Sequence, residues 1–193
     1  LPAHVQVVGV ELPGHGKRLA EQRIDNLQTL VQNIGVELYN YVDAPFAFFG
    51  HSMGALLALE LARFAKRHRL VMPRQLFVSA HRAPQLPRTK EPLHVLPEQE
   101  FVQRLKELNG TPSEVLQNEE LRSLFLPIIR ADFQVCETYE YRPFPKLDCP
   151  ITVFGGIDDD EVDISGLEAW EHMTNGPTSV HMFEGDHFFI HNA

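Results

Sequence analysis

The pentapeptide Gly50-His51-Ser52-Met53-Gly54 has the G-x-S-x-G form of a nucleophile elbow. In such an elbow a strand turns sharply into a helix, and the serine hydroxyl is exposed near the positive end of that helix. We expect both glycines to be required, because a Cβ atom at either position would clash with the neighbouring strand and helix. The motif predicts that Ser52 is a catalytic nucleophile and that the N–H of Met53 is one donor of an oxyanion hole.

A serine hydroxyl is a poor nucleophile at neutral pH, so it needs a general base and an acid that orients this base. With this elbow the chain order is serine, then acid, then histidine. His187 fits the base, because it follows a strand-like segment and a Gly-Asp turn near the end of the sequence. The acid is Asp158, Asp159 or Asp160, which follow another strand-like segment. Only one of the three can point at the imidazole, and the residues alone do not choose among them.

Two further histidines, of the ten in the sequence, lie close to recognisable motifs. His51 is inside the elbow and is interpreted as a packing or hydrogen-bonding residue. His15, in a loop over residues 12–16, could line a substrate pocket. No His–Cys spacing indicates a metal site, and the predicted chemistry needs neither a metal nor another cofactor.

The segments that carry these residues alternate between strand-like and helix-like patterns. Apolar, strand-like runs occur at residues 5–12, 44–49, 75–79, 150–154 and 178–183, and strong helix formers occupy 55–62. Such alternation predicts an α/β fold with a mainly parallel sheet. Because parallel strands end at one edge of a sheet, Ser52, the acid and His187 should meet there.

The stretch from about residue 91 to 141 interrupts this alternation. It has a helical pattern in two halves, 97–109 and 111–135. Thr111 fits an N-cap, Pro112 the first helical position and Glu114 the partner in a capping box.

Composition limits the class of protein. The 193 residues, 44% of them hydrophobic, predict a single globular domain. Because there is no run of about 20 apolar residues, no membrane span is expected. The net charge of −9 argues against binding to nucleic acid or to anionic membranes. Cys136 and Cys149 have no redox or metal spacing, which is typical of reduced thiols in a cytoplasmic protein. We expect a monomer.

Taken together, several motifs resemble those of type II thioesterases of the α/β-hydrolase superfamily. These are proofreading enzymes of non-ribosomal peptide and polyketide synthases, and the medium-chain S-acyl fatty acid synthase thioesterase is related to them. The motifs are Leu12-Pro13-Gly14-His15-Gly16-Lys17-Arg18, Phe49-Gly50-His51-Ser52-Met53-Gly54-Ala55, Leu108-Asn109-Gly110-Thr111-Pro112, Arg130-Ala131-Asp132-Phe133, Cys149-Pro150-Ile151, Ala169-Trp170 and Gly185-Asp186-His187-Phe188-Phe189.

The resemblance implies an α/β-hydrolase fold in which residues 91–141 form a helical lid over an acyl pocket. The alternative is that these helices pack as ordinary elements on the sheet. The family's Gly-x-x-Asp-Pro-x-Val motif aligns with residues 156–162 if Asp160 replaces the proline, which makes Asp159 the acid. His15 and Asn109 replace the family's usual arginine and glycine. Asp132 is interpreted as a buried hydrogen-bonding residue.

Relative to the family, the sequence lacks N-terminal strands with a Gly-rich loop, which supplies the second oxyanion donor, and a final helix. We therefore expect a domain truncated at both ends.

The implied function is hydrolysis of acyl or aminoacyl thioesters on the phosphopantetheine arm of an acyl or peptidyl carrier protein. The basic residues Arg82, Arg88 and Lys90 would then contact the carrier, or else form a solvated loop. A carboxylesterase or lipase would use the same three catalytic residues. An acyltransferase fits less well, because that class uses a Ser-His pair. A non-catalytic interaction module is the remaining alternative.

Overall fold

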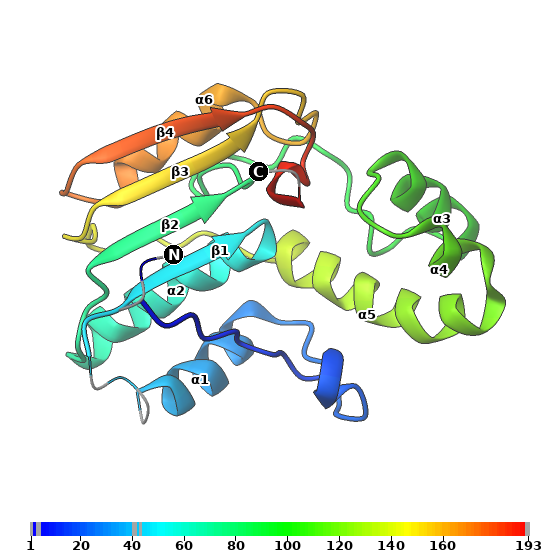
Figure 1. Cartoon of the computed structure of the whole chain (residues 1–193), viewed down its shortest axis with the longest axis horizontal. Helices are drawn as coiled ribbons and strands as arrows, with labels where there is room; N and C mark the ends of the chain where they lie inside the picture. Colours follow the sequence, from blue (N-terminus) through cyan, green and yellow to red (C-terminus); the bar gives the residue numbers. More distant parts are fainter. Residues whose placement is uncertain (1, 3–4, 40–41, 43, 192–193) are drawn as a thin grey trace.

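Four parallel strands form the central sheet of this computed structural model, which describes residues 2, 5–39, 42 and 44–191. The strands are β1 (Ala47–His51), β2 (Gln75–Ser79), β3 (Ile151–Gly156) and β4 (Thr178–Phe183). They are hydrogen-bonded in the order β1-β2-β3-β4, and every pairing is parallel. All four carboxyl ends therefore lie at one edge of the sheet, as the alternating sequence pattern predicts (Figure 1).

Helices cover one face of this sheet. Helix α2 (Met53–His68) lies against β1 and β2, α6 (Ile164–Glu168) and the 3₁₀ turn η2 (Ala169–Met173) lie against β3, and α1 (Leu27–Leu38) packs on α2. Two further 3₁₀ turns are η1 (Gly16–Arg18) and η3 (Phe189–His191). Leu59 of α2 and Trp170 of η2 are completely buried against Val78 and Val153 of the central strands. Residues at alternate positions of the strands thus build a core that fixes the sheet beneath α2.

The helical insertion, residues 91–141, contains α3 (Glu98–Glu107), α4 (Ser113–Gln117) and α5 (Glu119–Glu137). These helices lie beyond the carboxyl ends of the strands (Figure 1) and have a small core of their own, with Phe101 completely buried. The predicted helix over residues 111–135 is wrong in detail. Pro112, and not Thr111, is the N-cap of α4, and α5 begins anew after Asn118. The Asn118 side chain accepts the N–H groups of two following residues, which makes it the stronger N-cap.

Residues 5–12 do not form the strand that their valines predict. Val7 and Val8 are 72% and 74% exposed, and the segment pairs with no strand in the part of the chain that the structure describes. A strand needs a neighbour for its ladder of backbone hydrogen bonds, so an apolar pattern alone does not create one. None of the described helices combines the length and the hydropathy that crossing a membrane requires.

Candidate active site

Ser52 lies on the sharp turn between β1 and α2. Its backbone angles are φ 51° and ψ −117°, in a region that residues other than glycine rarely adopt. The turn is held by the Ser52 N–H, which donates to the carbonyl of Ser79 at 2.8 Å. This hydrogen bond ties the strained residue to the end of the neighbouring strand β2.

The two glycines of the elbow differ in what they accommodate. A Cβ atom at Gly50 would lie 1.9 Å from the carbonyl oxygen of Gly54, so the close approach of strand and helix requires glycine there. A Cβ atom at Gly54 would meet no described atom within 4 Å. The expectation that both glycines avoid a clash with the neighbouring strand and helix is therefore correct for Gly50 and wrong for Gly54, where there is room for a Cβ atom.

Three predicted side chains form one hydrogen-bonded chain. The Nε2 atom of His187 lies 3.0 Å from the Ser52 hydroxyl, and its Nδ1 atom lies 3.0 Å from a carboxylate oxygen of Asp159. Because a carboxylate only accepts, the Nδ1–H donates to Asp159, and Nε2 is left to accept the Ser52 proton. The Asp159 side chain is 1% exposed and that of His187 is 15% exposed.

Asp159 is the one of the three adjacent aspartates that contacts His187. Its second carboxylate oxygen accepts the N–H of Glu161 at 2.8 Å, so both oxygens have donors. Asp158 and Asp160 are exposed.

The loops that carry the acid and the base are tied together by their backbones. The Asp158 N–H donates to the carbonyl of Gly185 at 3.0 Å. A Cβ atom at Gly156 would lie 2.4 Å from the carbonyl oxygen of Asp186. Glycine at position 156 therefore lets the histidine loop pack directly on the end of β3.

A cavity of about 1640 Å³ opens beside the hydroxyl of Ser52. Ser52 and His187 line it, and the rest of its wall comes from residues 80–93, from the helical insertion and from Leu56, Glu161, Val162 and Phe188. Apolar side chains of the insertion, including Phe125, Ile129 and Phe133, line it. Met53 also lines the cavity; as the first residue of α2, its N–H has no intrahelical partner. The arrangement can hold an apolar acyl chain with its carbonyl at Ser52.

Two neutral imidazoles lie close to these groups. His51 packs edge-on against His187, with ring centroids 5.4 Å apart, and its Nδ1 forms a 2.9 Å hydrogen bond with the Ser79 hydroxyl. Burial first, then the charge of His187, lowers the pKa of His51 to about 4. His81 lines the cavity, and burial lowers its pKa to about 4 as well. His81 was missed by sequence reasoning, although its place after β2, at the catalytic edge, was a usable signal.

His15 and Asp132, which the sequence placed in separate motifs, meet in the structure. The Nε2 of His15 donates to Asp132 over 2.9 Å, and burial raises the pKa of that carboxyl group. Asp132 lines the large cavity, whereas His15 lines a smaller adjoining hollow. The pair thus joins the loop after residue 12 to helix α5.

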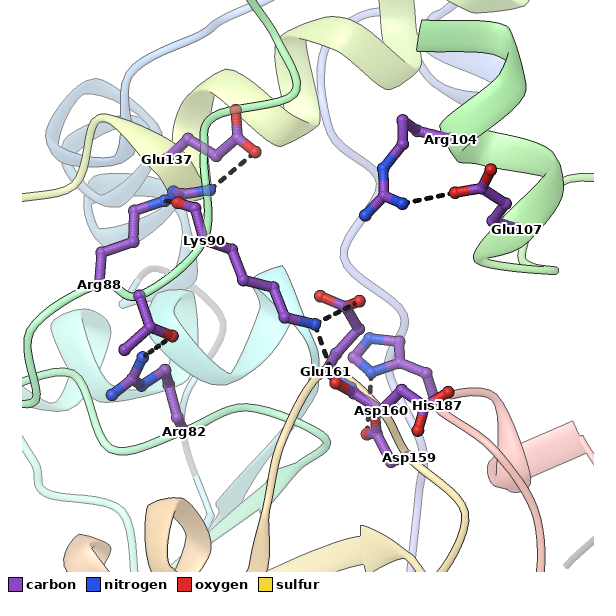
Figure 2. Close-up of polar contacts among 11 residues, drawn as sticks. Arg82, Arg88, Lys90, Arg104, Glu107, Glu137, Asp159, Asp160, Glu161 and His187 are labelled. Atoms are coloured by element: carbon purple, nitrogen blue, oxygen red, sulfur yellow. Dashed lines mark hydrogen bonds and ion pairs between the residues drawn. The ribbon is translucent and has the colours of Figure 1, made fainter. Parts of the chain in front are cut away.

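The basic residues after β2 are largely paired with carboxylates. Arg88 forms a 2.8 Å ion pair with Glu137, and Lys90 forms a 2.7 Å ion pair with Glu161. Figure 2 shows the Lys90 side chain reaching the loop that carries the acid, next to Asp159 and His187. The partners of these ion pairs are 49 and 71 residues apart in sequence, so no local sequence pattern predicts the pairs.

Glu137 is a buried anchor for the whole segment. Its side chain is 3% exposed and accepts the backbone N–H groups of Leu93 and His94 at 2.8 and 2.9 Å, as well as the His94 imidazole. Together with the Arg88 pair, these contacts fix residues 88–94, of which 88–93 line the cavity, to the end of α5.

Comparisons with known proteins agree on one family. A family model described as "Thioesterase domain" matches residues 1–193. The gramicidin S biosynthesis protein GrsT of Aneurinibacillus migulanus is 45% identical over 192 residues, which are 100% of this chain and 75% of that protein.

Two solved structures are similar over almost the whole chain. One is the type II thioesterase BorB from the borrelidin biosynthetic cluster, with a TM-score of 0.84 and 40% identity over 94% of this chain and 74% of that one. The other is ClbQ from the colibactin pathway, with a TM-score of 0.87 and 34% identity over 93% and 77% of the two chains. The predicted resemblance and the predicted fold class are confirmed.

Proposed function

This chain belongs to the thioesterase family, and from that premise we propose that it hydrolyses acyl or aminoacyl thioesters carried on the phosphopantetheine arm of a carrier protein. The observation that carries the proposal is the hydrogen-bonded chain of Ser52, His187 and Asp159, in which Ser52 and His187 line a mostly apolar cavity. A nucleophile with a base and an acyl-binding space are the parts that thioester hydrolysis needs.

In the proposed mechanism the Ser52 oxygen attacks the thioester carbonyl carbon while its proton passes to Nε2 of His187. Asp159 keeps Nδ1 protonated and stabilises the imidazolium. The Met53 N–H donates to the oxyanion, which is the role of the residue after the nucleophile in this elbow. Collapse of the tetrahedral species breaks the C–S bond, and the imidazolium returns its proton to the leaving thiolate. Water, deprotonated by His187, then attacks the carbonyl carbon of the Ser52 ester. Collapse of this second tetrahedral species breaks the bond to the Ser52 oxygen, which takes the proton back from the imidazolium, and the acid is released.

We assign the residues to one α/β-hydrolase domain, in which the helical insertion acts as a lid over the acyl group. Its apolar residues in the cavity wall and its position beyond the strand ends support this role (Figure 1). Relatives named for gramicidin S biosynthesis and for the borrelidin cluster support a carrier protein as the partner that delivers the substrate. Editing of mischarged carriers in such a synthase is the cellular role that we propose.

The proposal is tested by covalent labelling together with turnover. A fluorophosphonate probe should label Ser52, and the Ser52→Ala variant should neither be labelled nor hydrolyse an acyl-pantetheine thioester. As the matched control, Ser165→Ala removes an exposed serine hydroxyl outside the cavity and should change neither result. Labelling that persists in Ser52→Ala would reject the nucleophile. If oxygen esters react as well as thioesters, a general carboxylesterase is the better description.

A further inference from the structure

His81 is held in one orientation at the carboxyl edge of the sheet. It follows Ala80, whose φ is 50° and whose N–H donates to the carbonyl of Phe154 at 2.9 Å. The carbonyl of His81 accepts the indole N–H of Trp170 at 2.7 Å, and Trp170 is completely buried. The hydrogen bonds of the Ala80 N–H and of the His81 carbonyl therefore fix the backbone of His81.

The side chain has a defined tautomer. The Nδ1 atom of His81 lies 2.6 Å from the backbone carbonyl of Arg82. A carbonyl oxygen only accepts, so Nδ1 carries the proton, and in a neutral imidazole Nε2 must then be an unprotonated acceptor. Burial, assisted by the positive charges of His187, Arg82 and Arg88, lowers the pKa of His81 to about 4. The imidazole is therefore neutral at physiological pH.

His81 is one of the residues that line the cavity beside the nucleophile. His81 lines the cavity that Ser52 and His187 also line, and no hydrogen-bond donor for its Nε2 is found among the described residues. It comes two residues after Ser79, which ends β2 and whose carbonyl accepts the Ser52 N–H, so His81 follows the carboxyl end of the strand next to the elbow. A lone acceptor in a mostly apolar cavity binds a donor better than it binds a methylene group.

We propose that Nε2 of His81 accepts a hydrogen bond from an N–H group of the bound thioester, and that the cavity thereby favours thioesters that carry such a donor. The inference rests on the proposed thioesterase function and adds a substrate-binding residue to it. Two parts of a carrier-bound substrate can supply the donor: an amino or amide N–H of the acyl group, or an amide N–H of the pantetheine arm. Both share the chemistry that this acceptor recognises.

The test compares two variants, one that keeps the Nδ1–H donor of the imidazole and one that keeps its Nε2 acceptor. In His81→Asn the side-chain amide N–H takes the place of Nδ1–H and can still donate to the Arg82 carbonyl, but the acceptor at Nε2 is lost. In His81→Gln the longer side chain brings a carbonyl oxygen to the place of Nε2, so the acceptor is kept. Wild type and both variants are assayed with alanyl-pantetheine, propionyl-pantetheine and the propionyl thioester of ethanethiol, which has no N–H group.

We expect His81→Asn to lower kcat/KM about tenfold for the substrate whose N–H donor is bound, compared with the substrate that lacks only this donor. His81→Gln should restore most of this difference. A change in the alanyl-to-propionyl ratio assigns the donor to the acyl group. A change in the ratio of the two propionyl substrates assigns it to the arm. Each ratio is taken within one enzyme preparation, so a loss of folded protein cancels. Equal effects of His81→Asn on all three substrates would overturn the proposal.

Failure of the proposed function gives a different result, because wild type would then hydrolyse none of the three thioesters. In that case the same comparison is made with the Kd of non-hydrolysable ketone analogues, in which a methylene separates sulfur from carbonyl. His81→Asn should raise the Kd about tenfold, either for the alanyl analogue alone or for both pantetheine analogues relative to the ethanethiol one. Unchanged Kd ratios in that assay would reject the binding role of His81.

Discussion

The choice among three adjacent aspartates turns on where each side chain points. Asp159 is turned into the protein, where one oxygen contacts His187 and the other accepts the Glu161 N–H, whereas Asp158 and Asp160 face solvent. The sequence alone could not make this distinction, because the side chains of an irregular loop do not alternate regularly between the interior and the solvent. The contacts of Asp159 with His187 and of the Asp158 N–H with the Gly185 carbonyl join segments that are distant in the chain.

Asp159→Asn should therefore reduce kcat by roughly 10³–10⁴, because the amide cannot hold His187 in the tautomer that accepts the Ser52 proton. The matched controls are Asp158→Asn and Asp160→Asn, which remove the same charge from the same loop and should stay within about threefold of wild type. Steady-state kinetics on one acyl-pantetheine substrate measures kcat for all three variants. A larger loss in either control than in Asp159→Asn would assign the acid to that residue instead.

The neutral histidines near the site predict how stability depends on pH. His51 and His81 have pKa values of about 4 in the folded protein and near 6.5 when unfolded. Between these values the unfolded state binds more protons, so the free energy of unfolding falls as the pH is lowered from 6.5 toward 4 and is fully recovered above 6.5. Denaturant unfolding at several pH values should show this slope, and it should be shallower in His81→Asn. An identical slope in that variant would mean that His81 is protonated in the folded protein.

Among the elements, those with a strong local signal were predictable. β2 and β4 have the bounds expected from their apolar runs, and the elbow begins α2 directly after Ser52. The errors fall where tertiary contacts decide. Residues 5–12 have no pairing partner among the described residues, and Asn118 divides a long helical pattern because its side chain can cap a new helix. The Glu137 anchor, which joins α5 to residues 88–94, has no local signature.

The junction of β1 and α2 offers a matched pair of substitutions. Gly50→Ala places a methyl group against the carbonyl of Gly54, so it should destabilise the protein by several kcal/mol or displace the elbow and lower turnover. Gly54→Ala meets open space within a helix and should be neutral or stabilising by up to about 1 kcal/mol. Thermal unfolding and turnover on an acyl-pantetheine distinguish them. If both substitutions lowered stability and turnover equally, position 54 would have no room for a methyl group.

For the whole molecule, the net charge and the placement of the cations set how a carrier protein could dock. The chain carries a net charge of −9, so attraction to an acidic carrier needs local positive charge. Arg88 and Lys90 are engaged by Glu137 and Glu161, whereas Arg82 pairs with no carboxylate in the described part of the chain and donates only to Thr89. Of the three basic residues predicted to contact the carrier, Arg82 is therefore the one whose charge no described carboxylate neutralises.

A proofreading thioesterase must recognise the carrier and not only its acyl group. An acyl group on a holo-carrier protein should therefore be released with a higher kcat/KM than the same acyl group on pantetheine, because remote contacts help to position the thioester at Ser52. Arg82→Gln should reduce this advantage, most at low ionic strength, and leave the pantetheine substrate unchanged. Arg74→Gln is the control, because it removes an exposed cation before the opposite end of β2. If carrier and pantetheine substrates respond alike to Arg82→Gln, this residue has no part in docking. A carrier that gives no advantage even in wild type would instead favour a simple esterase.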